Sequence, residues 1–170
     1  VLYSNMVDTL VSGQLQGFGL ALLVISIIMM LIMKSVKLGL LSMIPNIIPI
    51  MMTAGGMGLL GIELNTATAM IAGVAIGIAV DDTIHFMTFY RRFLDKGMTV
   101  IEAVEKTIST TGIAMVTTST LLLLGFLTLA TSGFIPIRNF GILSSITMLS
   151  AILGDLILLP VLLVTSKWKS

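Results

Sequence analysis

The chain has 170 residues, of which 56% are hydrophobic and only 10% are charged. This balance excludes an ordinary soluble domain and indicates that the protein is surrounded by a lipid bilayer. The formal net charge of +1 is too small for its sign to indicate nucleic acid or acidic partners. We expect no nucleic-acid partner, no metal and no organic cofactor. The sequence contains no cysteine, so cysteine usage leaves the redox compartment undetermined.

Five apolar runs are long enough to cross a membrane, because a hydrocarbon core about 30 Å thick needs about 20 mostly apolar residues in a helix. The runs cover residues 16–33, 38–61, 66–90, 112–131 and 140–165. The sequence therefore predicts an all-α polytopic membrane protein, whose five-helix transmembrane bundle occupies residues 15–166. A soluble all-α protein with a large core is the alternative, but successive runs of this length contain too few charges for it.

Residues 1–14 precede the first run and are predicted to form an amphipathic lead-in helix. Leu2, Met6 and Leu10 recur at helical spacing among polar residues, which gives the helix one apolar stripe. The stripe suits either the membrane surface or an extracytoplasmic domain beyond this sequence, and the pattern does not separate the two. Because the chain opens with Val1, without a basic region and a small-residue cleavage site, we expect it to be a piece of a longer protein.

The second run contains Pro45 and Pro49, followed by several glycines. Each proline removes a backbone hydrogen bond and the glycines remove side-chain bulk, so we predict a kinked and closely packed helix. The freed carbonyl groups need donors from neighbouring helices or water, because lipid offers none. A fixed bend and a moving hinge are both compatible with this pattern.

A short cytoplasmic helix is predicted between the third and fourth runs. The helix that contains Arg91 should stop at Gly97, since glycine readily adopts the left-handed conformation at a helix C′ position. Thr99 and Glu102 have the spacing of a capping box, in which each side chain bonds the backbone of the other residue. We therefore expect a helix over residues 99–110 that lies on the cytoplasmic face of the membrane.

Basic residues are concentrated in alternate connections, which predicts how the chain crosses the membrane. They lie between the first and second runs, between the third and fourth, and after the fifth. In the other two connections the only charged residues are Glu63 and Arg138. By the positive-inside rule, the basic connections are cytoplasmic. The start of the chain is then expected outside, and the tail of residues 167–170 in the cytoplasm.

The third run contains the ionisable residues Asp81, Asp82 and His85. Charged side chains in a spanning helix cost several kcal/mol, which makes these residues functional candidates. At 100° per residue, Asp81 and His85 are about 40° apart and Asp82 lies about 60° beyond His85, so all three share one face. Gly73 and Gly77 continue the row of Asp81 and His85, and small residues at this spacing let another helix approach. We therefore predict that this face is buried.

Further polar residues lie at the depth of Asp81 when about 1.5 Å per residue is counted from the cytoplasmic ends. The sequence thus predicts one polar layer near the midplane, formed by Asn46, Asp81, Asp82, His85, the residues from Thr117 to Thr120, and Asp155. No Lys or Arg lies in this layer. Because burial and like charges disfavour ionised carboxyl groups, we expect at least one of the three to hold a proton near neutral pH.

The alternative is that the polar groups only hold the helices together by hydrogen bonds. This alternative stays open for Asp155, and it applies more strongly to the Thr run, because Thr often bonds back to its own helix. It is less apt for the adjacent acids Asp81 and Asp82. His85 serves either as a relay group or as a hydrogen-bond partner of the acids.

Residues 73–87 read GVAIGIAVDDTIHFM and are followed by YRR at residues 90–92. This stretch resembles the fourth or tenth transmembrane helix of the resistance-nodulation-division (RND) transporter superfamily. It is most similar to the branch of hydrophobe and lipid exporters related to the mycobacterial membrane-protein-large (MMPL) group and to sterol-sensing domains. The sequences PNIIP from residue 45, ELNTATA from residue 63 and DLILLP from residue 155 resemble the flanking helices, so the resemblance covers nearly the whole chain.

The resemblance implies a proton-driven export pump of two similar six-helix halves, each with a large extracytoplasmic domain. The chain would supply five helices of the C-terminal half, an assignment favoured by the ending KWKS. The expected partners are the bilayer of a bacterial or archaeal cytoplasmic membrane, the second transmembrane half and the extracytoplasmic domains on the same or another chain. The substrate would be hydrophobic or amphiphilic, such as a lipid, with protons as the coupling ion. A homo-oligomer is compatible with this picture.

In that superfamily the aspartates of the middle helices carry protons, and Asp81 and Asp82 occupy the matching positions. Thr117 and Thr118 match a polar region of the following helix that assists the relay. His85 and Asp155 are added as relay candidates because of their face and depth. The supporting polar or hinge residues are expected to be Asn46, Pro45, Pro49, Gly73 and Gly77. A lysine that pairs with the acids would lie in the other half.

Three other functions share parts of this pattern. Acids on two helices, such as Asp81 and Asp155, are typical of intramembrane aspartyl proteases. Residues 78–80 read IAV where that family has a Gly-x-Gly turn, so we expect no enzyme. A lipid- or sterol-sensing module without transport would share the fold. A SecD/SecF-like component of protein export is the third alternative, although its acidic helix usually lacks the double Asp.

Overall fold

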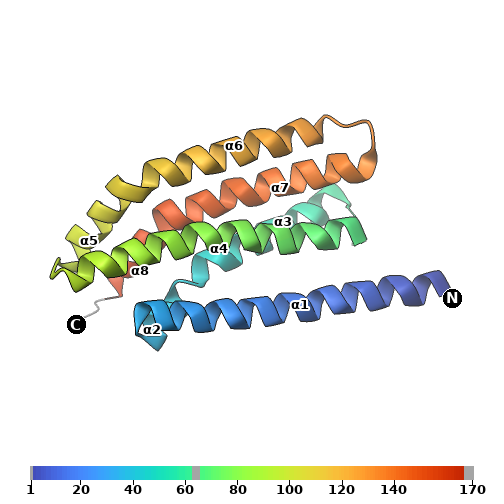
Figure 1. The fold of residues 1–170 in the computed structure, drawn as a ribbon. Helices are drawn as coiled ribbons and strands as arrows, with labels where there is room; N and C mark the ends of the chain where they lie inside the picture. The colour runs from blue at the N-terminus through green and yellow to red at the C-terminus, as the bar shows by residue number, and fades with distance from the viewer. Residues whose placement is uncertain (1, 63–65, 167–170) are drawn as a thin grey trace.

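The computed structural model describes residues 2–62 and 66–166, apart from some side chains at the starts of two helices. All regular elements in these ranges are helical, and they form an elongated bundle of five stretches (Figure 1). In chain order they are α1 (Leu2–Met33), α2 (Val36–Leu41) with α3 (Ile44–Leu60), α4 (Thr66–Asp95), α5 (Val100–Thr107) with η1 (Ile108–Gly112) and α6 (Ile113–Ala130), and α7 (Ile135–Leu153) with η2 (Gly154–Leu158) and α8 (Leu159–Thr165).

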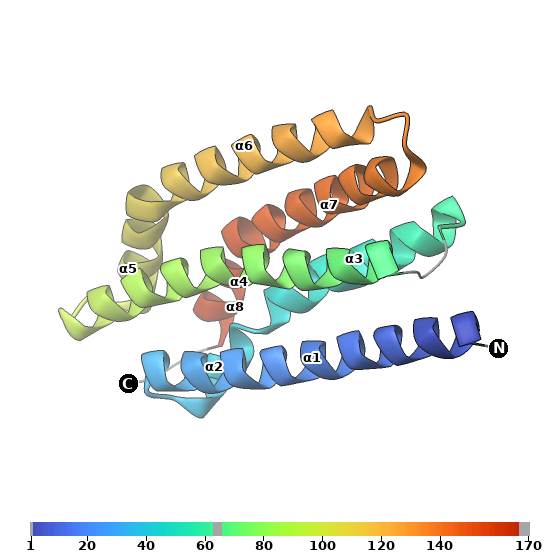
Figure 2. The same ribbon diagram turned by 45° about the vertical axis from the view of Figure 1, so that its right-hand side comes forward.

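The structure confirms the prediction of an all-α bundle. Within the described residues, four stretches are long and apolar enough to cross a membrane, namely Gln16–Met33, Val36–Leu60, Val100–Ala130 and Ile135–Thr165. The fifth stretch is α4, which has 30 residues and contains the acidic pair. It packs against α1, α3 and α7 and so lies at the centre of the bundle (Figures 1 and 2). Glu63 and the tail of residues 167–170 lie outside the described residues.

The first run and the residues before it form one continuous helix. α1 has 32 residues, so the lead-in of residues 1–14 is not a separate element where the structure describes it. Near the C-terminal end of α1, Met29 and Met33 are fully buried in a cluster with Phe86 and Tyr90 of α4. Burial of these large apolar side chains holds α1 against one side of α4.

The second run was predicted to be kinked, and a turn at Ser42 and Met43 divides it into α2 and α3. α2 ends at Leu41, and α3 begins at Ile44 with Pro45 in its first turn. A proline is tolerated there because the first helical N–H groups have no partner within the helix. Pro49 lies inside α3, and its carbonyl oxygen accepts a hydrogen bond from Thr53 Oγ1 at 2.7 Å. The prolines thus position the start of α3 within the bundle.

The predicted helix end at Gly97 is confirmed. Gly97 has a φ of 85°, and the amide of Met98 bonds back to the carbonyl of Phe93 at 3.3 Å. The capping box is also present, since the amide of Thr99 donates to Glu102 Oε2 at 2.8 Å. These contacts end α4 and begin α5.

No loop separates the helix expected over residues 99–110 from the fourth spanning run. α5 continues through η1 into α6 without a loop, and the chain changes direction along this stretch (Figure 2). η1 is a π-helical segment, and such segments commonly bend a helix. The surface helix and the spanning helix are therefore one continuous stretch.

A second π-helical segment, η2, interrupts the last spanning stretch at Asp155. Pro160 lies in the first turn of α8, immediately beyond it, and it has no N–H to donate to the preceding turn. Gly154 packs against the start of α3, where an added Cβ would lie 3.3 Å from the carbonyl oxygen of Pro45. The close approach at this glycine brings Asp155 beside Asn46.

Helices α6 and α7 approach each other closely at Gly141, where there is no room for a side chain. A Cβ at Gly141 would lie 2.6 Å from the carbonyl oxygen of Phe126. We expect Gly141→Ala to destabilise the protein by about 1–2 kcal/mol through overpacking, measured as unfolding in detergent. Gly125→Ala is the matched control, because nothing lies within 4 Å of a Cβ there. Equal stability of the two variants would contradict the prediction.

Candidate functional site

α4 turns Asp82 and Thr83 toward the interior of the bundle. Asp82 is 8% exposed and Thr83 is fully buried. Phe86 and Tyr90 follow at helical spacing on the same side and are also fully buried. Burial of these two aromatic rings fixes which face of α4 points inward. The buried part of the site therefore lies on the face that contains Asp82 and Thr83.

The row of Gly73, Gly77, Asp81 and His85 was predicted to be buried, and within the described chain this prediction is wrong. All four residues are exposed, and nothing lies within 4 Å of a Cβ built at Gly77. The opposite side of α4 faces the core instead, because it contains the large buried side chains of Phe86 and Tyr90. The small-residue row remains an outward face of this five-helix stretch.

One cluster of polar groups joins three helices, and we call Asn46, Thr83 and Asp155 the buried triad. Asn46 and Asp155 are each 1% exposed. Thr83 Oγ1 lies 2.6 Å from Asp155 Oδ1 and 3.0 Å from Asn46 Oδ1. The amide nitrogen of Asn46 donates to the carbonyl of Ser42 at 3.2 Å, which fixes the orientation of the side-chain amide.

The buried triad has two chemically distinct hydrogen-bond patterns. A hydroxyl has one proton to donate and can also accept. With Asp155 ionised, the Thr83 hydroxyl donates to the carboxylate. With Asp155 protonated at Oδ1, the carboxyl group can donate to Thr83, which then donates to Asn46. Asp155 Oδ2 is buried without a hydrogen-bond partner among the described residues, so this carboxyl group has one oxygen committed and one free.

A second contact links α4 to α6. Ser119 Oγ donates to Asp82 Oδ2 at 3.1 Å, and Ser119 is buried. The flanking Thr117 and Thr118 are exposed, and their hydroxyls bond to carbonyl groups of their own helix. Thus the polar run was found from the sequence, but the member that contacts the acid is Ser119.

The expected single layer therefore separates into two parts. The structure brings Asn46 and Asp155 together, and it connects Asp82 with α6, but it leaves Asp81 and His85 on the outer side of α4. Sequence reasoning missed Thr83, which is the central member of the buried triad. Its position one helical turn before two buried residues, Phe86 and Met87, is the pattern that predicts an inward side chain.

Asp81, Asp82 and His85 line a cavity of about 320 Å³ between α4, η1 and α6, to which α7 contributes Met148. We call this cavity the acidic groove. Its other polar side chains are Thr110, Thr111 and Thr118, and no Lys or Arg is among its described lining residues. The lining of the acidic groove thus includes two carboxyl groups, one imidazole and three threonine side chains. The described residues contain no group of three or more His, Cys, Asp and Glu side chains suited to hold a metal.

The fold and the site define an integral membrane protein, an all-α bundle with carboxyl groups among its spanning helices. The chain belongs to the MMPL family, whose sequence model matches residues 4–169. This finding confirms the family resemblance seen in the stretch around Asp81 and Asp82.

Relatives of the chain come from distant organisms. The chain is 31% identical over 143 residues to a membrane protein of Methanocaldococcus jannaschii, a match that covers 84% of this chain and 37% of that protein. It is 36% identical over 111 residues to the mouse protein patched homolog 2, covering 64% of this chain and 9% of that protein. It is 26% identical over 144 residues to the multidrug resistance protein MdtC of Escherichia coli, covering 81% of this chain and 14% of that protein. The chain therefore spans only a minor part of the length of these relatives.

Proposed function

We propose that this chain is the membrane half of a proton-driven exporter of hydrophobic or amphiphilic molecules. The observation that carries the proposal is the buried Asp82, which is bonded to Ser119 of α6 and lies next to Asp81 in the acidic groove. A carboxyl group inside a membrane bundle is costly, and it is typical of ion and proton pathways. The name of the relative MdtC, a multidrug resistance protein, supports export.

The coupling step is a change in the contact between α4 and α6. An ionised Asp82 accepts the hydrogen bond from Ser119 more strongly than a neutral acid does, because charge-assisted bonds are stronger. Proton uptake would weaken this contact and allow the two helices to move relative to each other. Proton release would restore it. The groove of about 320 Å³ supplies room for the water that brings protons to both acids.

The outward row of Gly73, Gly77, Asp81 and His85 is the face on which the second transmembrane half would pack. Small residues at this spacing allow close approach of another helix, and the row is exposed here. A basic group on that second half would then complete the charge balance of Asp81. In this arrangement the start of the chain lies outside and its end lies in the cytoplasm, as the distribution of basic residues predicts.

The experiment that tests the function uses liposomes in which the protein is reconstituted together with its second half. A pH gradient is imposed, and two signals are followed, an internal pH dye and the movement of a fluorescent lipid analogue. We expect the gradient to drive movement of the analogue in the native protein. The double variant Asp81→Asn with Asp82→Asn should fold normally but lose this movement.

Other outcomes identify the competing functions. Transport by the double variant at the native rate would overturn the proposal. Binding of the lipid analogue without any use of the gradient would indicate a sensing module. Gradient-dependent movement of an unfolded polypeptide instead of the lipid analogue would indicate a protein-export component similar to SecD/SecF.

A further inference from the structure

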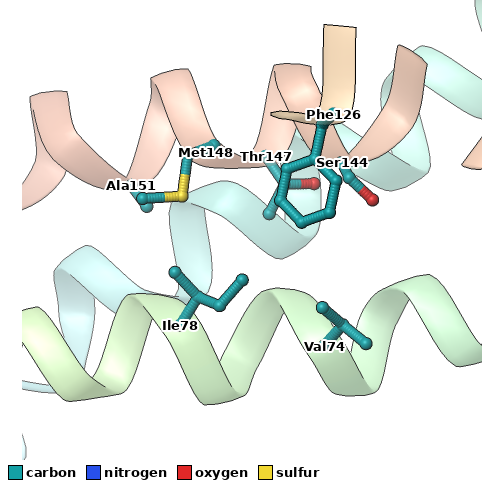
Figure 3. Close-up of a pocket in the computed structure, with 7 residues that line it drawn as sticks. All are labelled: Val74, Ile78, Phe126, Ser144, Thr147, Met148 and Ala151. Carbon is teal, nitrogen blue, oxygen red and sulfur yellow. The ribbon is translucent and has the colours of Figure 1, made fainter. Parts of the chain in front are cut away.

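A second, much smaller cavity lies between α4, α6 and α7 (Figure 3), and we call it the Ser144 pocket. Its volume is about 10 Å³, which is close to the minimum needed to hold one water molecule. Val74 and Ile78 of α4 and Phe126 of α6 form its apolar wall. Ser144 and Thr147 of α7 supply its polar groups.

One hydroxyl group of the mostly apolar Ser144 pocket is free to bind water, and it belongs to Ser144. Ser144 is 4% exposed, and its hydroxyl has no hydrogen-bond partner among the described residues. Thr147 Oγ1 donates to the carbonyl of Leu143 at 2.8 Å and contacts the hydroxyl of Thr53 in α3, so toward water it can only accept. Buried hydroxyls are nearly always satisfied by protein or by ordered water. A water molecule beside Ser144 would give its hydroxyl the missing partner.

Two side chains line both the Ser144 pocket and the acidic groove, namely Ile78 and Met148. Ile78 precedes Asp82 by one helical turn, about 6 Å along the axis. Figure 3 shows Ile78 on α4 and Met148 on α7 extending into the space between these two helices. Both side chains are apolar, so neither offers a hydrogen bond to water in the space between them.

We propose that the Ser144 pocket binds a single water molecule and that Ile78 and Met148 form the apolar barrier between this water and the acidic groove. When the two side chains separate, water in the pocket connects with Asp82 from the end of the bundle opposite Arg91. The binding of water rests on the pocket alone. The role of the barrier in proton movement rests on the function proposed above.

Hydroxyl-radical footprinting tests the water site without any transport assay. Radicals formed from bound water oxidise the nearest reactive side chains, and methionine and aromatic rings are among the most reactive. Phe126 lines the pocket but not the groove, whereas Met115 lines the groove but not the pocket. We expect Ser144→Val, which fills the pocket, to lower oxidation of Phe126 several-fold and to leave Met115 unchanged. Unchanged oxidation of Phe126 would overturn the water site.

A proton-leak assay tests the barrier in liposomes that contain the protein with its second half. We expect Ile78→Ala to increase proton leak in the absence of substrate by several-fold. Val74→Ala is the matched control, because Val74 lines the pocket but not the groove, and it should not increase the leak. Equal leak in the two variants would overturn the barrier.

The two tests separate failure of the barrier from failure of the proposed function. If Ile78→Ala does not leak while the Asp81 and Asp82 variants lose transport, the barrier alone is refuted. If the Asp variants transport normally, the proposed function is refuted, and footprinting still decides whether the pocket binds water.

Discussion

Thr83→Val is expected to destabilise the protein by about 1–3 kcal/mol, since the Thr83 hydroxyl has one proton and a buried acceptor left without its donor costs about that much. Valine has nearly the shape of threonine, so the change removes the hydroxyl and little else. Asp155 Oδ1 and Asn46 Oδ1 both lose their contact with Thr83. Unfolding in detergent at neutral pH, followed by circular dichroism, measures the loss.

Thr117→Val is the matched control for this prediction. Thr117 is exposed, and its hydroxyl bonds only to the carbonyl of Ile113 in its own helix. We expect this variant to change stability by less than about 0.5 kcal/mol, as is usual for surface substitutions. If Thr83→Val were as mild as Thr117→Val, the buried triad would not contribute to stability as the geometry indicates.

Much of the fold could be predicted because bilayer thickness imposes a length on every spanning helix. Local signals at Gly97 and Thr99 were also sufficient, since capping depends on residues that are near in sequence. The two π-helical segments, η1 and η2, were not predicted. They depend on how neighbouring helices pack, and periodicity in a single sequence contains no such information.

The site was predicted only in part for a related reason. Helical spacing places Asp81, Asp82 and His85 within a sector of about 100°, but it does not reveal where the edge of the buried face falls. The core formed with Phe86 and Tyr90 puts that edge between Asp81 and Asp82. The second half proposed above would extend burial to Asp81 if it packs on the outward row.

Asp82→Asn is expected to lower gradient-driven transport to the level of protein-free vesicles. Asparagine is close in size to aspartate and keeps an oxygen that accepts from Ser119, so the contact between α4 and α6 can persist. The amide cannot take up and release a proton near neutral pH, so the coupling step fails although the fold remains. Transport and unfolding are measured on the same preparation to separate these two effects.

Ser119→Ala and Thr117→Ala then show whether the contact seen in the structure matters for coupling. Ser119 donates to Asp82, whereas Thr117 bonds to its own helix and lines neither cavity. We expect Ser119→Ala to slow transport by about tenfold or more, since a hydrogen bond to a charged group contributes about 1.5–3 kcal/mol. Thr117→Ala should transport at the native rate. If the reverse order were observed, the relay would pass through the exposed face of α6, and Asp82 would act on a different partner from the one in the structure.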